Sequence, residues 1–418
     1  MLDRSFAPAF SKKFSFELPQ PQVFPLRGGL DLVFIPGLQQ EIVKIEVIFK
    51  AGKWHEPIPG LSHFTATMID KGTAAKSSKE IAGVFDFYGA QLEISAGYDF
   101  TSVSLYGLSK HLPEIFPVFW ELMNSPSFPE DELDLQKEIF IQNLLVNSEK
   151  NSFVASKLLR KNIFGQMHPY GRATEENDVR QLTKEDLKVF FKNNFHPVEI
   201  YLVGNLTPQK IEWLTQQFNS IIPQNIEEKN FSAQPGQLHQ QLAKTGSVQS
   251  SIRWGKQVIN RLHPDYFSLL LVNHLLGGYF GSRLMKSIRE EKGLTYGIYS
   301  SIHPFKNDCM VSIGADVNND KAGLAKEEIK KEIKRLKEIP VAETELAIAK
   351  NHFLGSLQLE VANPFAVLEK TKSIRLNKLG NTYYQDLFSK IESSHPEDIL
   401  LTAKKYFEPD SFQEVSVG

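Results

Sequence analysis

Short runs in which apolar and polar residues alternate are found in both halves of the chain. A period of two is typical of a strand with one buried face, because successive side chains point to opposite sides. These runs predict strands over residues 29–37, 41–52, 90–108 and 309–317. Residues 111–126 and 322–340 instead have helical periodicity, and the second stretch carries Glu-to-Lys pairs on what we expect to be its exposed face.

The order of these elements repeats along the chain. Residues 128–133 (FPEDEL) resemble residues 341–346 (VAETEL), which lie 213 positions later. Three further similarities follow in the same order at a nearly constant offset: 185–187 with 397–399, 195–197 with 407–409, and the β-like runs that end in Gly204 and Gly418. Helix-start signals such as Pro-Glu-Asp also recur by chance, but four ordered matches favour an internal duplication.

Strand pairs followed by helices in each copy predict an α+β fold with two homologous halves. Each half is expected to be a mainly antiparallel sheet covered by helices. Residues 223–246 lie between the copies and form a polar, glutamine-rich segment with proline and glycine, which is typical of a linker. We therefore expect an N-terminal half over residues 1–222 and a C-terminal half over residues 247–418.

Composition narrows the class of protein. The chain has 47 Lys and Arg against 49 Asp and Glu, so it lacks the basic excess that is typical of nucleic-acid-binding proteins. Cys309 is the only cysteine, which excludes a disulfide scaffold. Residues 1–22 contain no apolar run of the kind found in secretory signals, and residues 266–280 are too short and too polar to span a membrane. We expect a cytoplasmic protein that binds neither nucleic acid nor membrane.

Residues 60–73 (GLSHFTATMIDKGT) place a histidine in an apolar, helix-like stretch. The segment resembles the signature of the inverzincin, or pitrilysin-type, metallopeptidases, the group that includes mitochondrial processing peptidase. In that family H-x-x-E-H on a helix supplies two zinc ligands and a general base. His63 aligns with the first histidine, whereas Ala66 has the position of the glutamate and Thr67 that of the second histidine.

The family's third zinc ligand is a glutamate on a later helix, in a segment similar to residues 133–150. The resemblance puts Gln136 and Asn143 where the family has its two glutamates. Because a catalytic zinc needs about three protein ligands, we expect no metal in this chain. His63 is then expected to be a packed, hydrogen-bonded remnant.

A different metal site, built from His55, Glu56 and His63, is disfavoured. The first two residues lie on an expected loop that also contains Pro57 and Pro59. The remaining histidines show no metal-ligand spacing in the sequence.

Residues 270–301 closely resemble the family's C-terminal signature, in which a loop of small residues and Ser-Arg-Leu precede a helix. In related enzymes an arginine and a tyrosine seven positions later bind the substrate backbone near the scissile bond. Here these residues are Arg289 and Tyr296. The planar guanidinium and the phenol hydroxyl are donors that suit a carbonyl oxygen. We expect Gly293 to end the helix, so that Tyr296 lies on a strand beside Arg289.

This segment also has structural interpretations. Arg289 can pair with Glu290 or Glu291 on a solvated helix face, and Tyr296 can be an ordinary aromatic residue of a strand. The glycine-rich loop at residues 277–281 allows close backbone approach. It lacks the G-x-x-x-x-G-K-[ST] pattern of a phosphate-binding loop.

The resemblance covers nearly the whole chain and implies a clamshell of two halves. Some family members divide the work between two chains, one with the zinc motif and one with the Arg–Tyr pair. We therefore expect a non-catalytic subunit of a heterodimeric zinc peptidase, which encloses unfolded peptides and orients them for cleavage at the zinc of a homologous partner. Peptides would be held by strand addition to an exposed sheet edge. The alternatives are a purely architectural subunit of a larger complex and a peptidase with an unconventional metal site; the isolated chain can also form a homodimer.

Overall fold

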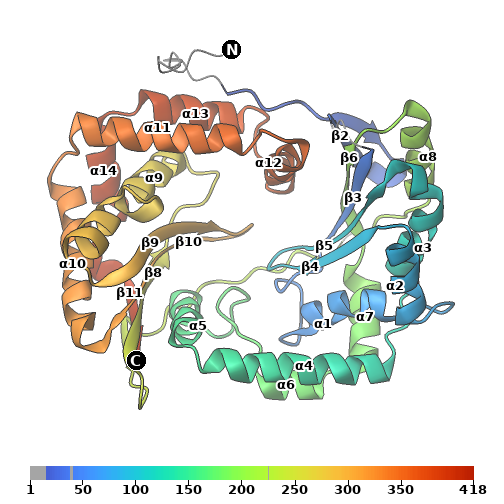
Figure 1. The fold of residues 1–418 in the computed structure, drawn as a ribbon, viewed down its shortest axis with the longest axis horizontal. Coiled ribbons are helices and arrows are strands. Elements are labelled where there is room, and N and C mark those ends of the chain that lie inside the picture. Colours follow the sequence, from blue (N-terminus) through green and yellow to red (C-terminus); the bar gives the residue numbers. More distant parts are fainter. Residues whose placement is uncertain (1–15, 38–40, 225) are drawn as a thin grey trace, which may run out of the picture.

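Two β-sheets organise the molecule, one in each half of the chain (Figure 1). The computed structural model describes residues 16–37, 41–224 and 226–418. The first sheet has the strand order β1 (Gln22–Pro25), β2 (Asp31–Pro36), β6 (Pro197–Gly204), β3 (Ile42–Phe49), β5 (Thr101–Leu108) and β4 (Gln91–Ala96). The second has the order β7 (His239–Leu242), β11 (Gln413–Val417), β8 (Gln249–Gln257), β10 (Cys309–Asn318) and β9 (Thr295–Pro304). Neighbouring strands are antiparallel except in the pairs β2–β6 and β7–β11.

Helices cover the outer face of each sheet (Figure 1). The N-terminal half contains α1 (Leu61–Thr67), α2 (Ser78–Phe87), α3 (Leu112–Asn124), α4 (Glu130–Ser148), α5 (Asn151–Phe164), α6 (Glu176–Gln181), α7 (Lys184–Asn194) and α8 (Pro208–Phe218). The C-terminal half contains α9 (Tyr266–Asn273), α10 (Ala322–Glu338), α11 (Glu343–Leu359), α12 (Pro364–Leu376), α13 (Tyr383–Ser393) and α14 (Pro396–Tyr406), with π-helical segments at η4 (His274–Gly278) and η5 (Met285–Glu291).

The alternation of apolar and polar residues along the strands explains why helices cover one face of each sheet. On β3, Val43, Ile45 and Val47 enter the apolar core beneath the helices of the N-terminal half. Lys44 and Glu46 alternate with them and point to the opposite, inner face of the sheet. The predicted fold class is confirmed: two α+β halves with mainly antiparallel sheets form a clamshell.

Each half contributes one helix to the sheet of the other half. The helix α5 belongs to the N-terminal half by sequence, yet it packs against β8 and β11 of the second sheet, where Leu159 and Ile163 share a core with Val415. The helix α12 begins 213 positions after α5, at Pro364 rather than Asn151, and lies against β2 and β6 of the first sheet (Figure 1). This reciprocal exchange ties the two halves together.

The repeated sequence corresponds to repeated helix starts. In α7, Thr183 and Asp186 form a capping box, in which each side chain accepts a hydrogen bond from the other residue's backbone N–H. At the start of α14, 212 positions later, the Asp398 carboxylate likewise accepts a hydrogen bond from the backbone N–H of His395, at 2.9 Å. These matched caps support the predicted duplication.

The expectation of an exposed, charged face on α10 is met only in part. The helix ends at Glu338, two residues before the end of the predicted range, and Glu327, Lys330 and Lys331 are exposed, but Glu328 and Glu332 are buried. The reason is that α10 lies between the second sheet and η5, so parts of its polar side are covered as well. Glu332 pairs with Arg335 of the same helix at 2.8 Å, and Glu328 pairs with Lys292 at 3.2 Å.

Three other expectations concern the chain as a whole. In the described part of the chain, no helix is both long and apolar enough to cross a membrane. Residues 1–15 of the segment that was expected to lack a secretory signal lie outside the described residues. The boundaries at residues 222 and 246 stay predictions.

Candidate functional site

The helix α1 carries the zinc-like motif and is held by apolar packing. Phe64, Ala66 and Met68 are fully buried in the core of the N-terminal half. The ring of His63 lies against those of Phe64 and Phe140, with centroids 5.4 and 5.2 Å away. Among the described residues no hydrogen bond engages this ring, so His63 is packed, as expected, but not hydrogen-bonded.

The other positions of the motif offer no set of metal ligands. Ala66 presents only a methyl group, and the Thr67 hydroxyl donates to the carbonyl oxygen of His63 at 3.0 Å, within the helix. Asn143 lies exposed on α4, and Gln136 is half-buried there. Burial lowers the pKa of His63, and the nearby Lys53 lowers it further. One imidazole beside an alanine, a threonine and an amide does not fit a catalytic zinc site.

Glu56 has a structural role, and the neighbouring His55 is buried. The Glu56 carboxylate accepts hydrogen bonds from the backbone N–H and hydroxyl of Ser62, at 3.0 and 2.7 Å, and so caps the start of α1. Arg172 donates to the same carboxylate at 3.2 Å. His55 is buried, and burial lowers its pKa to about 4.

The fold does bring two other histidines together. His274 Nε2 and His352 Nδ1 are 3.2 Å apart, although the residues are far apart in the sequence. Their rings contact Tyr279. Across the described ranges, no group of three or more His, Cys, Asp or Glu residues is placed to hold a metal ion.

The Arg–Tyr segment adopts the predicted turn. Arg289 lies in the last turn of η5, Gly293 has a φ of +60°, and β9 begins at Thr295. The left-handed φ favours glycine, which explains why the helix ends there.

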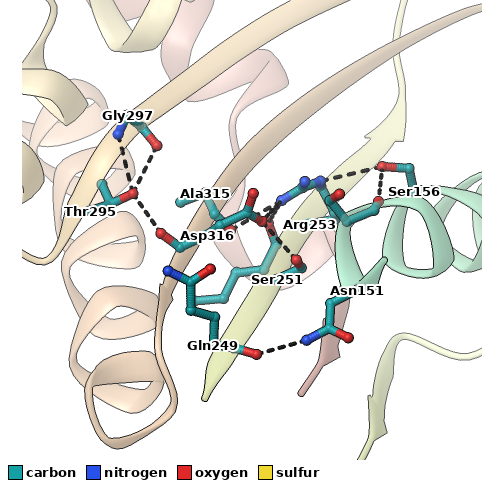
Figure 2. Close-up of polar contacts among 11 residues, drawn as sticks. Asn151, Ser156, Gln249, Ser251, Arg253, Thr295, Gly297, Ala315 and Asp316 are labelled. Atoms are coloured by element: carbon teal, nitrogen blue, oxygen red, sulfur yellow. Dashed lines mark hydrogen bonds and ion pairs between the residues drawn. The ribbon is translucent and has the colours of Figure 1, made fainter. Parts of the chain in front are cut away.

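A β-bulge then sets the direction of Tyr296. Ala315 of β10 pairs with Ile298 and Val317 pairs with Thr295, so Tyr296 and Gly297 together face the single residue Asp316. Thr295 closes the bulge, because its hydroxyl donates to the Asp316 main-chain carbonyl at 2.7 Å and accepts from Gly297 N at 3.2 Å (Figure 2). Bulges redirect side chains near binding sites, and Tyr296 is 96% exposed.

The alternative that pairs Arg289 with a neighbouring glutamate does not hold. Within residues 16–37, 41–224 and 226–418, no ion pair or hydrogen bond engages the Arg289 guanidinium. It lies instead over the ring of Phe280, 4.6 Å from the centroid. Phe280 is itself 62% exposed. The arrangement leaves the guanidinium N–H groups available to a ligand.

The glycine-rich loop serves packing within the protein. A Cβ on Gly277 would lie 2.7 Å from the backbone nitrogen of Ser300 on β9. The neighbouring Asn273 donates to the Ser300 carbonyl at 3.0 Å and accepts from its hydroxyl. The loop therefore approaches a strand, not a phosphate.

Arg289 and Tyr296 line one open pocket. The remaining lining residues come from the end of η5 and the turn after it, from one end of the β9–β10 pair, and from β8: Gln249, Glu290, Gly293, Leu294, Thr295, Asp316, Val317 and Asn318. The family resemblance predicted the pair, but the sequence did not reveal Gln249 and Asp316, because strand pairing brings these distant residues to it.

Two strands lie at sheet edges beside the two motif segments. β4 ends the first sheet next to α1, and β9 ends the second sheet next to the Arg–Tyr pocket. A strand at a sheet edge has backbone N–H and C=O groups directed away from the sheet. The site can thus combine main-chain hydrogen bonds with two side-chain donors for a peptide carbonyl.

Comparison with known proteins agrees with these features. Residues 33–178 match the model of Insulinase (Peptidase family M16), and residues 181–353 match that of the Peptidase M16 inactive domain. An uncharacterized zinc protease, YmxG, from Bacillus subtilis is 24% identical over 93% of this chain and 96% of its own length. An uncharacterized zinc protease from Rickettsia bellii is 22% identical over 92% of this chain and 94% of its own.

Solved structures show the same fold. A peptidase M16 inactive domain from Pseudomonas fluorescens has a TM-score of 0.88 and 25% identity, covering 96% of this chain and 98% of that one. A protease from Helicobacter pylori has a TM-score of 0.86 and 19% identity, covering 96% and 100%. The two family models follow one another along the chain, as the two sheets do, and the chain belongs to peptidase family M16.

Proposed function

We propose that this chain is the non-catalytic subunit of a heterodimeric zinc peptidase, in which it holds unfolded peptides for cleavage at the zinc of a homologous partner. One observation carries the proposal. The zinc positions hold Ala66, Thr67 and Asn143, which cannot make a catalytic site. Tyr296 is exposed and Arg289 is half-buried, and neither has a polar partner among the described residues. A purely architectural subunit would have no use for such a pair.

In the proposed complex, this chain binds and orients the peptide. The Arg289 guanidinium and the Tyr296 hydroxyl donate hydrogen bonds to a peptide carbonyl oxygen, and the ring of Phe280 keeps the guanidinium in place. The edge of a sheet supplies further main-chain hydrogen bonds. Zinc in the partner would supply the activated water, and no residue of this chain takes part in that step.

The test uses the chain with its copurified partner. Removal of a hydrogen bond to an arginine costs about 1.5–3 kcal/mol, so Arg289→Ala should lower peptide cleavage about 10- to 100-fold. Tyr296→Phe should lower it by a smaller factor. Tyr299→Phe is a matched control, because Tyr299 is on the same strand but its ring covers Gly314. Unchanged cleavage in the first two variants would favour the architectural role instead.

The same preparation addresses the unconventional metal site. The isolated chain is expected to hold no stoichiometric zinc and to cleave no peptide. Bound zinc measured by atomic emission, together with chelator-sensitive cleavage by the chain alone, would overturn the non-catalytic assignment.

A further inference from the structure

Cationic side chains line a pocket where the two halves and the segment that connects them meet. Its walls include the residue after β3, the start of β6, residues 228–230 of the connecting segment, the turn between β9 and β10, and the end of α12. The pocket has a volume of about 430 Å³, within the range of roughly 300–1,000 Å³ that is typical of small-molecule sites. It shares no lining residue with the pocket of Arg289 and Tyr296. A ligand bound here would therefore leave the proposed peptide site free.

The pocket has more cationic than anionic side chains. Its cations come from both halves and from the connecting segment: Lys50, Lys229, Lys306, Arg375 and Lys378. Its two carboxylates are those of Glu199 and Glu228. Five positive and two negative groups give the described lining a formal charge of +3, although the whole chain carries −2. A local excess of one sign in a concave surface concentrates ligands of the opposite sign.

The carboxylates compensate only part of this charge. Glu199 accepts a hydrogen bond from Arg375 at 2.7 Å. Glu228 Oε1 accepts from Lys50 of the N-terminal half at 2.7 Å and from Lys306 of the C-terminal half at 3.3 Å, so that two ammonium groups share one oxygen. The Glu228 side chain is 52% exposed. Because it is half exposed, this carboxylate can turn into solvent when a more highly charged anion binds the same two lysines.

The other two lysines of the pocket have no carboxylate partner among the described residues. Lys229 donates to the main-chain carbonyl oxygen of His55 at 3.1 Å. Lys378 is exposed, and within the described ranges no hydrogen bond or ion pair engages its ammonium group. Ammonium groups bind phosphate oxygens as point charges. Both side chains are therefore available to an anion.

The charges of the pocket act together on a buried neighbour, His55. Burial lowers the pKa of His55 to about 4, and Glu228 opposes this effect. Lys306, Lys50 and Lys229 each lower the pKa further. Since all three act on one imidazole, their ammonium groups lie close enough to act on one ligand.

The end of α12 does not repel an anion strongly. The C-terminal end of a helix carries a partial negative charge, which resides on its last carbonyl groups. Here the Asn377 amide donates to the Ser373 carbonyl at 2.8 Å, and the backbone N–H of Leu379 donates to the Ile374 carbonyl at 2.9 Å. These donors compensate the helix end, and Asn230 adds a further amide to the pocket wall.

We propose that this pocket binds the phosphate chain of a small polyanion, such as triphosphate or a nucleoside triphosphate. A phosphate group carries about −1.5 to −2 charges near pH 7, so about two are needed to balance the charge of +3. Lys50, Lys306 and Lys378 hold the chain from both halves, and Glu228 is displaced. The site is independent of the proposed peptide role.

The probes are triphosphate, pyrophosphate, orthophosphate and ATP, each titrated calorimetrically into the full chain in metal-free buffer at about 0.05 M salt. Triphosphate should bind with a stoichiometry of about one and at least about tenfold more tightly than orthophosphate, because each added charge-assisted hydrogen bond is worth about a factor of ten. ATP should bind about as tightly as triphosphate, and pyrophosphate between triphosphate and orthophosphate. Raising the salt to about 0.5 M should weaken the binding of all four.

Substitutions locate the site. Lys306→Met and Lys378→Met should each weaken triphosphate binding about tenfold, whereas Glu228→Gln should tighten it. Lys378 has no polar partner among the described residues, so its replacement should leave the thermal unfolding of the free protein unchanged. Lys334→Met is the matched control, because Lys334 is 66% exposed on α10 and pairs with Glu338. Arg289→Ala should bind triphosphate as the wild type does.

Three results would overturn the inference. The first is equal affinity for triphosphate and orthophosphate, or binding of ATP without binding of triphosphate. The second is wild-type triphosphate affinity in both Lys306→Met and Lys378→Met, or a loss of affinity in Lys334→Met or Arg289→Ala that equals theirs. The third is weaker binding by Glu228→Gln. Failure of the proposed function would instead show in peptide cleavage by the Arg289 and Tyr296 variants.

Discussion

Replacement of Glu46 by glutamine tests whether the exchanged helix α12 holds the two halves together. Glu46 lies on β3 of the first sheet and is only 2% exposed. Its carboxylate binds Lys372 of α12 at 2.7 Å and Lys44 of its own strand at 2.8 Å. The glutamine variant keeps the shape of the side chain and removes the charge that both lysines share.

The expected cost follows from what the two lysines retain. Removal of one partner of a buried pair costs about 3–5 kcal/mol, because the other charge stays buried without compensation. Here Lys372 keeps Glu369 at 2.7 Å, and Lys44 keeps the ring of Tyr106, 5.1 Å from its ammonium. We therefore expect the free energy of unfolding to fall by about 3 kcal/mol, at the lower end of that range.

Urea unfolding, followed by tryptophan fluorescence, measures this change. Glu369→Gln is the matched control: Glu369 contacts the same lysine but is 60% exposed, so its loss should cost less than about 1 kcal/mol. A double-mutant cycle of Glu46→Gln and Lys372→Met separates the contact between the halves from the contact of Glu46 with Lys44. The expected coupling energy between Glu46 and Lys372 is about 1–2 kcal/mol. A coupling near zero, or equal costs for the two glutamine variants, would refute the reasoning.

Two further predictions concern pH and metal. Burial lowers the pKa values of His55 and His274 to about 4, against about 6.5 in an unfolded chain. As the pH falls, the unfolded state therefore binds protons before the folded state does. The free energy of unfolding should decrease as the pH drops from about 6.5 to about 4. Thermal unfolding over this range checks it, and His274→Phe should flatten the profile; an unchanged slope would count against the assignment. Thr67→His with Asn143→Glu should restore three ligands with His63 and bind about one zinc per chain by atomic emission, whereas Thr67→His alone should bind less. Failure of the double variant would mean that α1 and α4 have lost the family's spacing.

Much of the site could be read from local sequence. Once the family resemblance has assigned the zinc positions, the loss of the motif follows from the identities of Ala66, Thr67 and Asn143, since metal binding depends on residue type. The Arg289–Tyr296 pair was likewise predicted from the resemblance, and the turn between the two residues could be predicted from Gly293, because the end of a helix is a local event. What local sequence could not show is that Arg289 has no acidic partner among the described residues and lies over Phe280 instead.

The sequence by itself determined the two α+β halves, their duplication and the residues in the zinc-like and Arg–Tyr motifs. Periodicity, capping and spacing depend on residues that are close together in the chain. Only the tertiary structure decided what depends on distant pairing. It placed Asp316 opposite the Tyr296 bulge through the register of β9 and β10, and it buried Glu328 and Glu332 of α10. It also exchanged α5 and α12 between the sheets. A helix with one polar and one apolar face can pack on either sheet. Which sheet it packs on depends on the sum of its long-range contacts, which no local sequence pattern shows.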